Sequence, residues 1–359
     1  MIGIVGLWLS AGFLWESWAH LHVGVESFFT PYHAVFYSAM LVGAGVMGSA
    51  ALRNRRLGYA RNRLLPAAYR QALLGVPIFF LGGVGDFIWH SFFGVENRIE
   101  AVTSPTHLII GFGVVLVLSA PIRSALGARA ELHSLRDELP LLFSLAACLE
   151  FVHLGTSYAF DPSAGRLDAP PNGSNFSADY FTANAIVLYK TGSGVMIVIL
   201  TSLIEMAFAI WLATRFSLKF GAMTLFFVLG DGMIAAALTN TRPLLVIHLI
   251  MALVAGIVAD ISIARLRPSR SDSGLRIFGL VVPLAYYGSF FAATLALEGT
   301  WWNWSLIGGA IVWSALAGVA LTMLVPSRNN RAEAPFVFTS LPAARKLVRS
   351  AKRAGRLSS

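Results

Sequence analysis

Two segments of the chain carry an acidic residue followed four positions later by a histidine. Glu16 precedes His20 in the first segment, and Asp86 precedes His90 in the second. Residues four apart lie on one face of an α-helix, so the two side chains of each pair can approach a common ligand. Carboxylate and imidazole are both good ligands for first-row transition metals. Each pair is therefore a candidate for metal binding.

The match between the two segments continues beyond these pairs. Each first histidine is followed by a Gly-Val-Glu triplet and then by a Pro-x-His motif that ends at His33 or His107. Proline is favoured in the first turn of a helix, so Pro31 and Pro105 should begin the returning helices. Each segment thus predicts a helix, an outer loop and a returning helix that bring three ligands together. The two predicted sets are Glu16, His20, His33 and Asp86, His90, His107.

Two later parts of the chain repeat only some of this pattern. Glu150 and His153 are three residues apart in the third predicted helix pair. The fourth pair has Asp231 and His248, but Ala235 stands where the first histidine would fall. These pairs either descend from the same hairpin or carry an acid in an apolar helix by chance, and both readings stay open. Glu150 and His153 are retained as candidate metal ligands.

The elements that must position these residues are hydrophobic helices. Of the 359 residues, 56% are hydrophobic and only 13% are charged, about half the charged share of an ordinary soluble domain. That composition excludes a soluble enzyme. Apolar runs of membrane-spanning length predict an all-α, polytopic membrane bundle of about ten transmembrane helices. The runs lie at residues 2–21, 32–52, 72–92, 107–126, 139–158, 185–214, 218–238, 243–264, 275–297 and 302–325.

The predicted bundle covers residues 1–325 and is built from repeated helical hairpins. The two matched hairpins lie at about 1–52 and 72–126, and the partial repeats at 139–214 and 218–264. A basic tail follows at residues 326–359.

Basic residues predict the orientation of the bundle. Lysine and arginine gather after every second predicted helix, whereas the alternate loops hold little beyond Arg98, Arg166 and Arg242. Because basic loops are retained in the cytoplasm, both termini and the tail should be cytoplasmic. We expect a multi-pass protein of the cell inner membrane with both matched hairpins turning near its outer face.

The formal net charge of +9 arises from these loops and the tail. Beyond Phe336 and Phe338, no aromatic residue interrupts the basic charges of the tail, so a nucleic-acid partner is not expected. Membrane lipid is the expected partner. The basic tail either binds anionic headgroups or is a disordered segment that only sets the topology.

Carboxylates within apolar helices need a partner. A charged residue at the centre of a membrane helix costs about 3 kcal/mol on insertion scales, so it normally faces a partner group, water or a metal. The simpler alternative is that the acid–histidine pairs only join helices by hydrogen bonds; two matched sets favour a metal. Cys148 is the single cysteine, so a thiolate cluster is excluded. Glu205 and Asp260 either line a proton path or hydrogen-bond to a neighbouring helix.

The first hairpin resembles a known copper-binding motif. Its Glu16-x3-His20-x12-His33 pattern ends in Phe29-Thr30-Pro31-Tyr32-His33. It is similar to an Asp-x3-His-x12-His set, ending in Phe-Thr-Pro-x-His, that binds copper within the membrane in the copper membrane monooxygenases, which oxidise methane or ammonia. The resemblance implies a copper triad of Glu16, His20 and His33. By the internal match it extends to Asp86, His90 and His107.

The chain also departs from that family. Glu16 replaces the aspartate, the second hairpin has sixteen residues between His90 and His107, and ten helices exceed the number in the family's copper-binding membrane subunit. Nothing in the chain resembles the family's soluble copper-binding domain.

These observations predict an integral membrane metal-binding protein with copper as the expected metal and zinc or iron as alternatives. Three functions remain open. The chain is a membrane oxidoreductase that uses the metal to activate oxygen, a transporter of metal ions or protons, or a non-catalytic subunit of a membrane complex. An oxidoreductase predicts an apolar pocket beside the ligands, which Trp15, Trp18, Phe87 and Trp89 could line.

Overall fold

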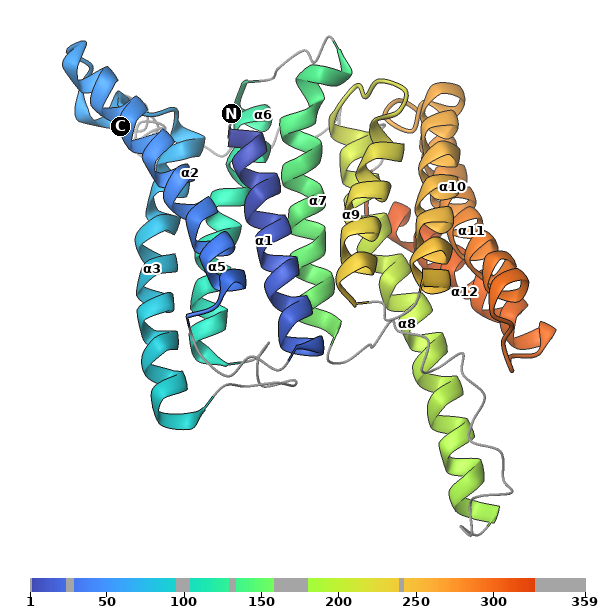
Figure 1. The fold of residues 1–359 in the computed structure, drawn as a ribbon. Coiled ribbons are helices and arrows are strands. Elements are labelled where there is room, and N and C mark those ends of the chain that lie inside the picture. The colour runs from blue at the N-terminus through green and yellow to red at the C-terminus, as the bar shows by residue number, and fades with distance from the viewer. Residues whose placement is uncertain are drawn as a thin grey trace, which may run out of the picture. The chain divides into compact units, whose positions relative to one another are not determined.

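The computed structural model describes residues 2–23, 29–94, 104–128, 134–157, 180–238 and 242–326. These residues form helices and no strand, which confirms the predicted all-α class (Figure 1). The elements are α1 (Ile2–His22), α2 (Pro31–Arg56), the short 3-10 helix η1 (Arg61–Arg63), α3 (Ala67–Phe93), α5 (Pro105–Leu118), α6 (Ala120–Ala128), α7 (Leu135–Ser157), α8 (Tyr180–Arg215), α9 (Ala222–Leu238), α10 (Arg242–Leu266), α11 (Asp272–Leu297) and α12 (Trp304–Met323).

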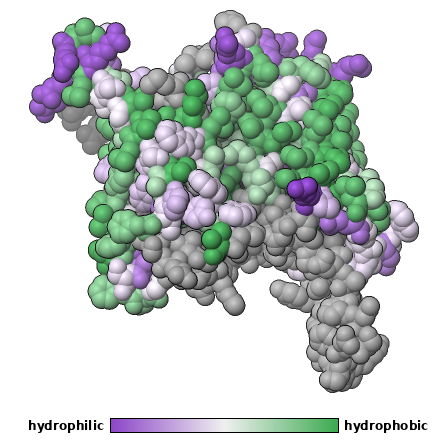
Figure 2. Space-filling view, viewed as in Figure 1, coloured by the Kyte–Doolittle hydropathy of each residue, from purple (hydrophilic) through white to green (hydrophobic). Residues whose placement is uncertain are grey.

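Seven helices within the described residues are long and apolar enough to cross a membrane. They support the expected multi-pass membrane protein. Figure 2 shows hydrophobic side chains, in green, over much of the coloured helix flanks, and hydrophilic ones, in purple, where α2 leads into α3. Ten crossings, the repeat origin and the orientation stay predictions. The chain divides into two units, Met1–Thr322 and Met323–Ser359, and the predicted tail beyond Pro326 lies outside the described residues.

Helix α7 contacts helices from both halves of the first unit. It packs against α1, α5 and α6, which are part of the N-terminal half, and against α8 and α9. Helices α9, α10 and α11 then pack in sequence order. Side chains of α7 therefore meet different neighbouring helices, which matters for the placement of Glu150 and His153.

Helices α3 and α5 approach each other closely because glycines line their contact. A Cβ atom at Gly75 would lie 2.6 Å from the carbonyl oxygen of Gly113, and one at Gly113 would lie 2.7 Å from the backbone nitrogen of Phe79. Small residues allow two helix backbones to come together in this way. The side chains that follow Gly75 on α3 and those that precede Gly113 on α5 are thereby brought within reach of each other.

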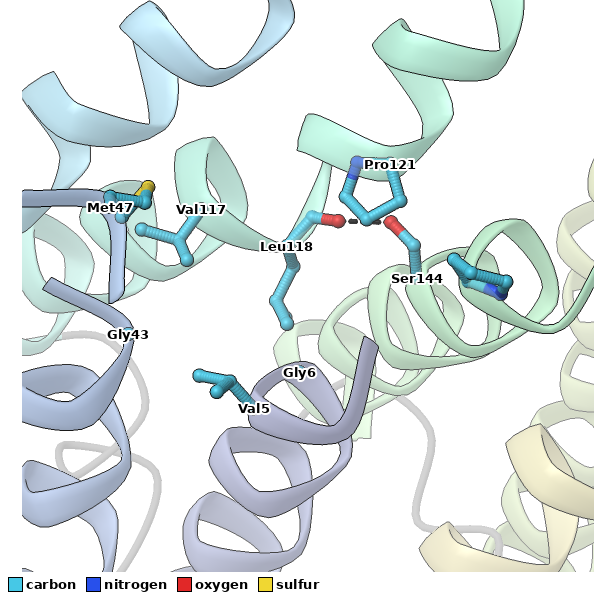
Figure 3. Close-up of a pocket in the computed structure, with 9 residues that line it drawn as sticks. Val5, Gly6, Gly43, Met47, Val117, Leu118, Pro121 and Ser144 are labelled. Atoms are coloured by element: carbon cyan, nitrogen blue, oxygen red, sulfur yellow. Dashed lines mark hydrogen bonds between the residues drawn. The ribbon is translucent and has the colours of Figure 1, made fainter. Parts of the chain in front are cut away.

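The fourth predicted span is interrupted where α5 ends and α6 begins. Pro121 has no backbone N–H, and proline within a helical stretch displaces the carbonyl groups before it. The hydroxyl of Ser144 in α7 donates a hydrogen bond to the carbonyl oxygen of Leu118, as Figure 3 shows. Beside this contact is a cavity of about 20 Å³, enough for one water-sized molecule, lined mainly by apolar groups that include Val5 and Met47.

Candidate metal centres

The structure brings Asp86, His90 and His107 together. One ligand atom from each lies within 4.8 Å of the others, and we call this group the first cluster. The Nε2 atom of His90 lies 3.3 Å from Asp86 Oδ2, and the Nε2 atom of His107 lies 3.3 Å from Asp86 Oδ1. Asp86 is completely buried and His90 nearly so. The three predicted residues of the second hairpin therefore form one compact set of donors.

Local sequence explains why these residues meet. Asp86 and His90 are one helical turn apart near the C-terminal end of α3. His107 lies in the first turn of α5, where Pro105 begins the helix and the Ser104 hydroxyl accepts a hydrogen bond from the His107 backbone N–H at 3.4 Å. Serine is a preferred N-terminal cap, and proline is favoured directly after it.

The imidazole of His90 is held so that its Nε2 atom faces Asp86. Its Nδ1 atom lies 2.9 Å from the carbonyl oxygen of Gly94. A carbonyl oxygen only accepts hydrogen bonds, so Nδ1 must carry a proton. Gly94 ends α3 with a positive φ of 81°, a conformation that glycine adopts without steric cost. This gives the glycine of the Gly-Val-Glu triplet a structural role in the second hairpin.

The proton on His90 Nδ1 limits how Nε2 of the same ring can interact with Asp86. With Nδ1 protonated, His90 Nε2 either carries a second proton or directs its lone pair at the carboxylate. A lone pair beside an anionic oxygen requires a cation between them, and neutral imidazole with its other N–H fixed by a carbonyl is the usual state of a metal-binding histidine. Thr106 donates a hydrogen bond of 2.7 Å to Asp86 Oδ1 and so also orients the carboxylate. The arrangement suits a cation bound by Asp86, His90 and His107.

In the first hairpin the structure pairs Glu16 with His33. Glu16 Oε1 lies 2.9 Å from His33 Nε2, and both side chains are buried. Thr30 caps α2 as Ser104 caps α5, accepting from the His33 backbone N–H at 3.2 Å, and its hydroxyl lies 2.9 Å from His33 Nδ1. The side chain of His20 lies outside the described residues. The described part of this hairpin thus repeats the acid–histidine contact between its two helices.

Tyr37 of the first hairpin contacts α3 of the second. It follows His33 by one turn of α2, and a Cβ atom at Gly83 of α3 would lie 2.5 Å from its hydroxyl oxygen. Tyr37 and His107 each interact electrostatically with both Glu16 and Asp86. The two acid–histidine sets therefore belong to one polar region, although the group of three donors within 4.8 Å includes neither Glu16 nor His33.

A second group of donors consists of His153, Glu205 and Asp231, which we call the second cluster. One ligand atom from each lies within 4.8 Å of the others, and they come from α7, α8 and α9. His153 Nε2 lies 2.7 Å from Glu205 Oε1. The predicted ligand Glu150 is not part of this group: its carboxylate accepts a hydrogen bond from Ser10 of α1. The structure thus places the two residues of the predicted third pair in different environments.

Sequence reasoning did not join Glu205 and Asp231 to His153. Each of these acids lies within an apolar helix, which predicts that it has a polar partner but does not identify that partner. Asp260, also considered for a proton path, accepts hydrogen bonds from the backbone N–H groups of Met223 and Thr224 at 3.1 and 3.0 Å. It therefore stabilises the start of α9, the second of the two alternatives for this residue.

The four aromatic residues expected to line a pocket lie in different contacts. Trp15 and Trp18 line an open groove with Met233 of α9. The ring of Phe87 lies tilted against that of Phe29, and the ring of Trp89 against that of Phe93, with centroids 5.8 and 4.5 Å apart. Glu16 contacts His33 of α2 and does not line this groove, although the Trp15 ring also meets Tyr32 of α2 at a centroid distance of 5.0 Å.

Comparisons with known proteins do not add a family to this picture. No protein-family model, no curated protein and no solved structure matches the chain.

Proposed function

We propose that this chain is an integral membrane protein that binds a transition metal at the first cluster, with copper as the first candidate. The observation that carries the proposal is the orientation of His90. Its Nδ1 proton is directed to the Gly94 carbonyl, and its Nε2 atom and that of His107 converge on the buried Asp86 carboxylate. Two imidazoles and one carboxylate can supply three ligands to one ion.

The donor set supports copper but also accepts other metals. Imidazole is a ligand for copper, zinc and iron, and of the divalent ions copper binds such sites most tightly. The resemblance to the copper motif of the membrane monooxygenases points the same way. When bound, copper would supply one-electron redox chemistry, while Thr106 and Gly94 hold the carboxylate and imidazole in place. Glu16 and His33 add a second carboxylate–imidazole contact next to this centre.

The test compares metal content among single variants of the full-length chain. We expect Asp86→Asn, His90→Ala and His107→Ala each to bind one copper ion per chain fewer than the unchanged protein after copper loading and dialysis. His248→Ala is the matched control, because this half-buried histidine is bonded to the Leu244 carbonyl and lies in neither cluster. Elemental analysis of detergent-purified protein measures the content.

Loading with zinc or iron in parallel separates the metals, since the preferred ion survives the longest dialysis against chelator. Gel filtration and thermal melting confirm that the variants remain folded. Wild-type copper content in all three cluster variants would contradict the proposal and leave the acid–histidine contacts as links between helices.

A further inference from the structure

The second cluster joins α7, α8 and α9, and its two carboxyl groups are buried among these helices. Asp231 is nine residues from Ala222, where α9 begins, which corresponds to about 14 Å along the helix. Glu205 and Asp231 are only 2% and 3% exposed. Two carboxyl groups and one imidazole therefore meet where there is almost no contact with solvent.

The carboxylates of this cluster need a positive partner. Tyr286 of α11 donates a hydrogen bond of 2.9 Å to Asp231 Oδ1, and His153 contacts Glu205 Oε1. The other oxygens, Glu205 Oε2 and Asp231 Oδ2, are buried and accept no hydrogen bond from a donor group within the described residues. The two carboxyl groups lie close enough to each other to share a hydrogen bond. Two carboxylates this close cannot both stay ionised without a cation, which is either a shared proton or a metal ion.

We infer that His153, Glu205 and Asp231 form a second metal centre that binds a divalent cation of the harder first-row type, such as Mn²⁺. A divalent ion balances two carboxylates and a neutral imidazole, which leaves the buried group without net charge. The ion would also be bound by the buried carboxylate oxygens that accept no hydrogen bond from the protein. The proposal goes beyond the function assigned to the first cluster and does not depend on it.

The donor chemistry distinguishes the two centres. The first cluster offers two imidazoles and one carboxylate, whereas the second offers one imidazole and two carboxylates. Mn²⁺ prefers carboxylate oxygens, whereas copper prefers imidazole nitrogens. The second cluster therefore suits Mn²⁺ better than the first cluster does. Tyr286, bonded to Asp231, acts as a positioning residue that orients the carboxylate.

The experiment uses the full-length chain, purified in detergent, and Mn²⁺ alone. Asp86→Asn is introduced first, so that the first cluster does not contribute. We expect this variant to bind one Mn²⁺ per chain, measured as loss of the free-ion signal in electron paramagnetic resonance. Adding Glu205→Gln or Asp231→Asn should abolish this binding. Copper content of the His90→Ala variant is measured separately, so failure of either centre is recognised independently.

A milder variant tests the arrangement without removing a ligand. Tyr286→Phe should weaken Mn²⁺ binding about 10- to 100-fold, as loss of a group that orients a ligand does. Tyr287→Phe is the control, because this neighbouring buried phenol hydrogen-bonds to Thr201 and Ser202 of α8 and acts on Glu205 and Asp231 only electrostatically. Equal affinity in the two tyrosine variants, or equal Mn²⁺ binding with and without Asp231→Asn, would overturn the proposal. Absence of Mn²⁺ binding, with a protonated-carboxyl infrared band that Asp231→Asn removes, would also overturn it and identify a shared proton.

Discussion

Asp86 is the residue on which the first cluster depends. Its two oxygens are approached by His90 from the same helix and by His107 and Thr106 from α5. The imidazoles would share a cation with the carboxylate, whereas the Thr106 hydroxyl donates a hydrogen bond directly to the carboxylate. Thr106 therefore fixes the carboxylate without taking a coordination position.

Replacing Thr106 by valine should weaken metal binding without removing the site. We expect Thr106→Val to lower copper affinity about 10- to 100-fold, because groups that orient a ligand typically contribute this much. The number of ions bound at saturation should stay the same, since all three ligands remain. Titration of the purified protein against a competing chelator measures the affinity.

Thr294→Val is the matched control for that variant. Thr294 is also buried, and its hydroxyl donates a hydrogen bond of 2.8 Å to the Phe290 carbonyl of its own helix, α11. The control loses a comparable hydroxyl far from the first cluster along the chain. The same copper affinity in both variants would show that Thr106 does not orient the ligand.

Glu150 provides a test of the second cluster. Because its carboxylate accepts from Ser10, Glu150→Gln should leave Mn²⁺ binding unchanged in the Asp86→Asn background, and glutamine keeps an oxygen that Ser10 can reach. His153→Gln should abolish that binding. Electron paramagnetic resonance compares the two. Loss of Mn²⁺ in Glu150→Gln would restore Glu150 to the ligand set.

A site residue could be predicted from the sequence where its contacts are set by residues nearby in the chain. Asp86, His90 and His107 could be grouped from the sequence because one helical turn and one capped hairpin bring them together. His153 meets Glu205 and Asp231 only through the packing of α7, α8 and α9, which no local spacing encodes. Glu150 and His153 are three residues apart on α7 yet contact α1 and α8, respectively.

At the scale of the element, the first cluster depends on the close contact of α3 and α5. Gly75 and Gly113 allow this approach, and neither a helix propensity nor a hydrophobic period would reveal it. Apolar runs predicted where the helices lie because their length is set by the membrane. They did not predict the interruption between α5 and α6. There the Leu118 carbonyl accepts a hydrogen bond from Ser144 of α7, a contact that the local sequence does not encode.

Gly113→Ala should separate the two helices that carry the first cluster. Its Cβ atom would lie 2.7 Å from the backbone nitrogen of Phe79 and 2.8 Å from the Gly75 carbonyl oxygen, and backbone atoms cannot rotate aside. Overpacking of this kind costs about 1–3 kcal/mol, more than alanine gains in helix propensity. We expect a lower melting temperature and weaker copper binding.

The control is Gly45→Ala in α2, where an added Cβ atom meets nothing within 4 Å. Alanine is favoured over glycine within a helix by about 1 kcal/mol, so this variant should melt at the same or a higher temperature and keep its copper. Thermal melting and copper titration of the two variants give the comparison. Equal stability would mean that α3 and α5 can adjust to the extra methyl group.

At the scale of the whole molecule, orientation decides from which side the first cluster is reached. The cluster lies where α3 ends and α5 begins. If α5 and α6 together cross the membrane once, and every other long helix crosses once, the end of α11 lies on the same side as the cluster. The basic segment between α2 and α3, which includes η1, then lies on the other side. Basic residues predict that this second side is cytoplasmic.

Cysteine labelling tests this orientation, because Cys148 is the only cysteine to remove. In a Cys148→Ser background, Glu298→Cys at the end of α11 should react with a membrane-impermeant maleimide on intact cells. Arg61→Cys in η1 should react only after permeabilisation; both side chains are exposed in the structure. The opposite pattern would invert the topology, and labelling of both positions on intact cells would contradict the alternation of helices. The expected pattern places the first cluster near the outer face, so that added copper reaches it without crossing the membrane.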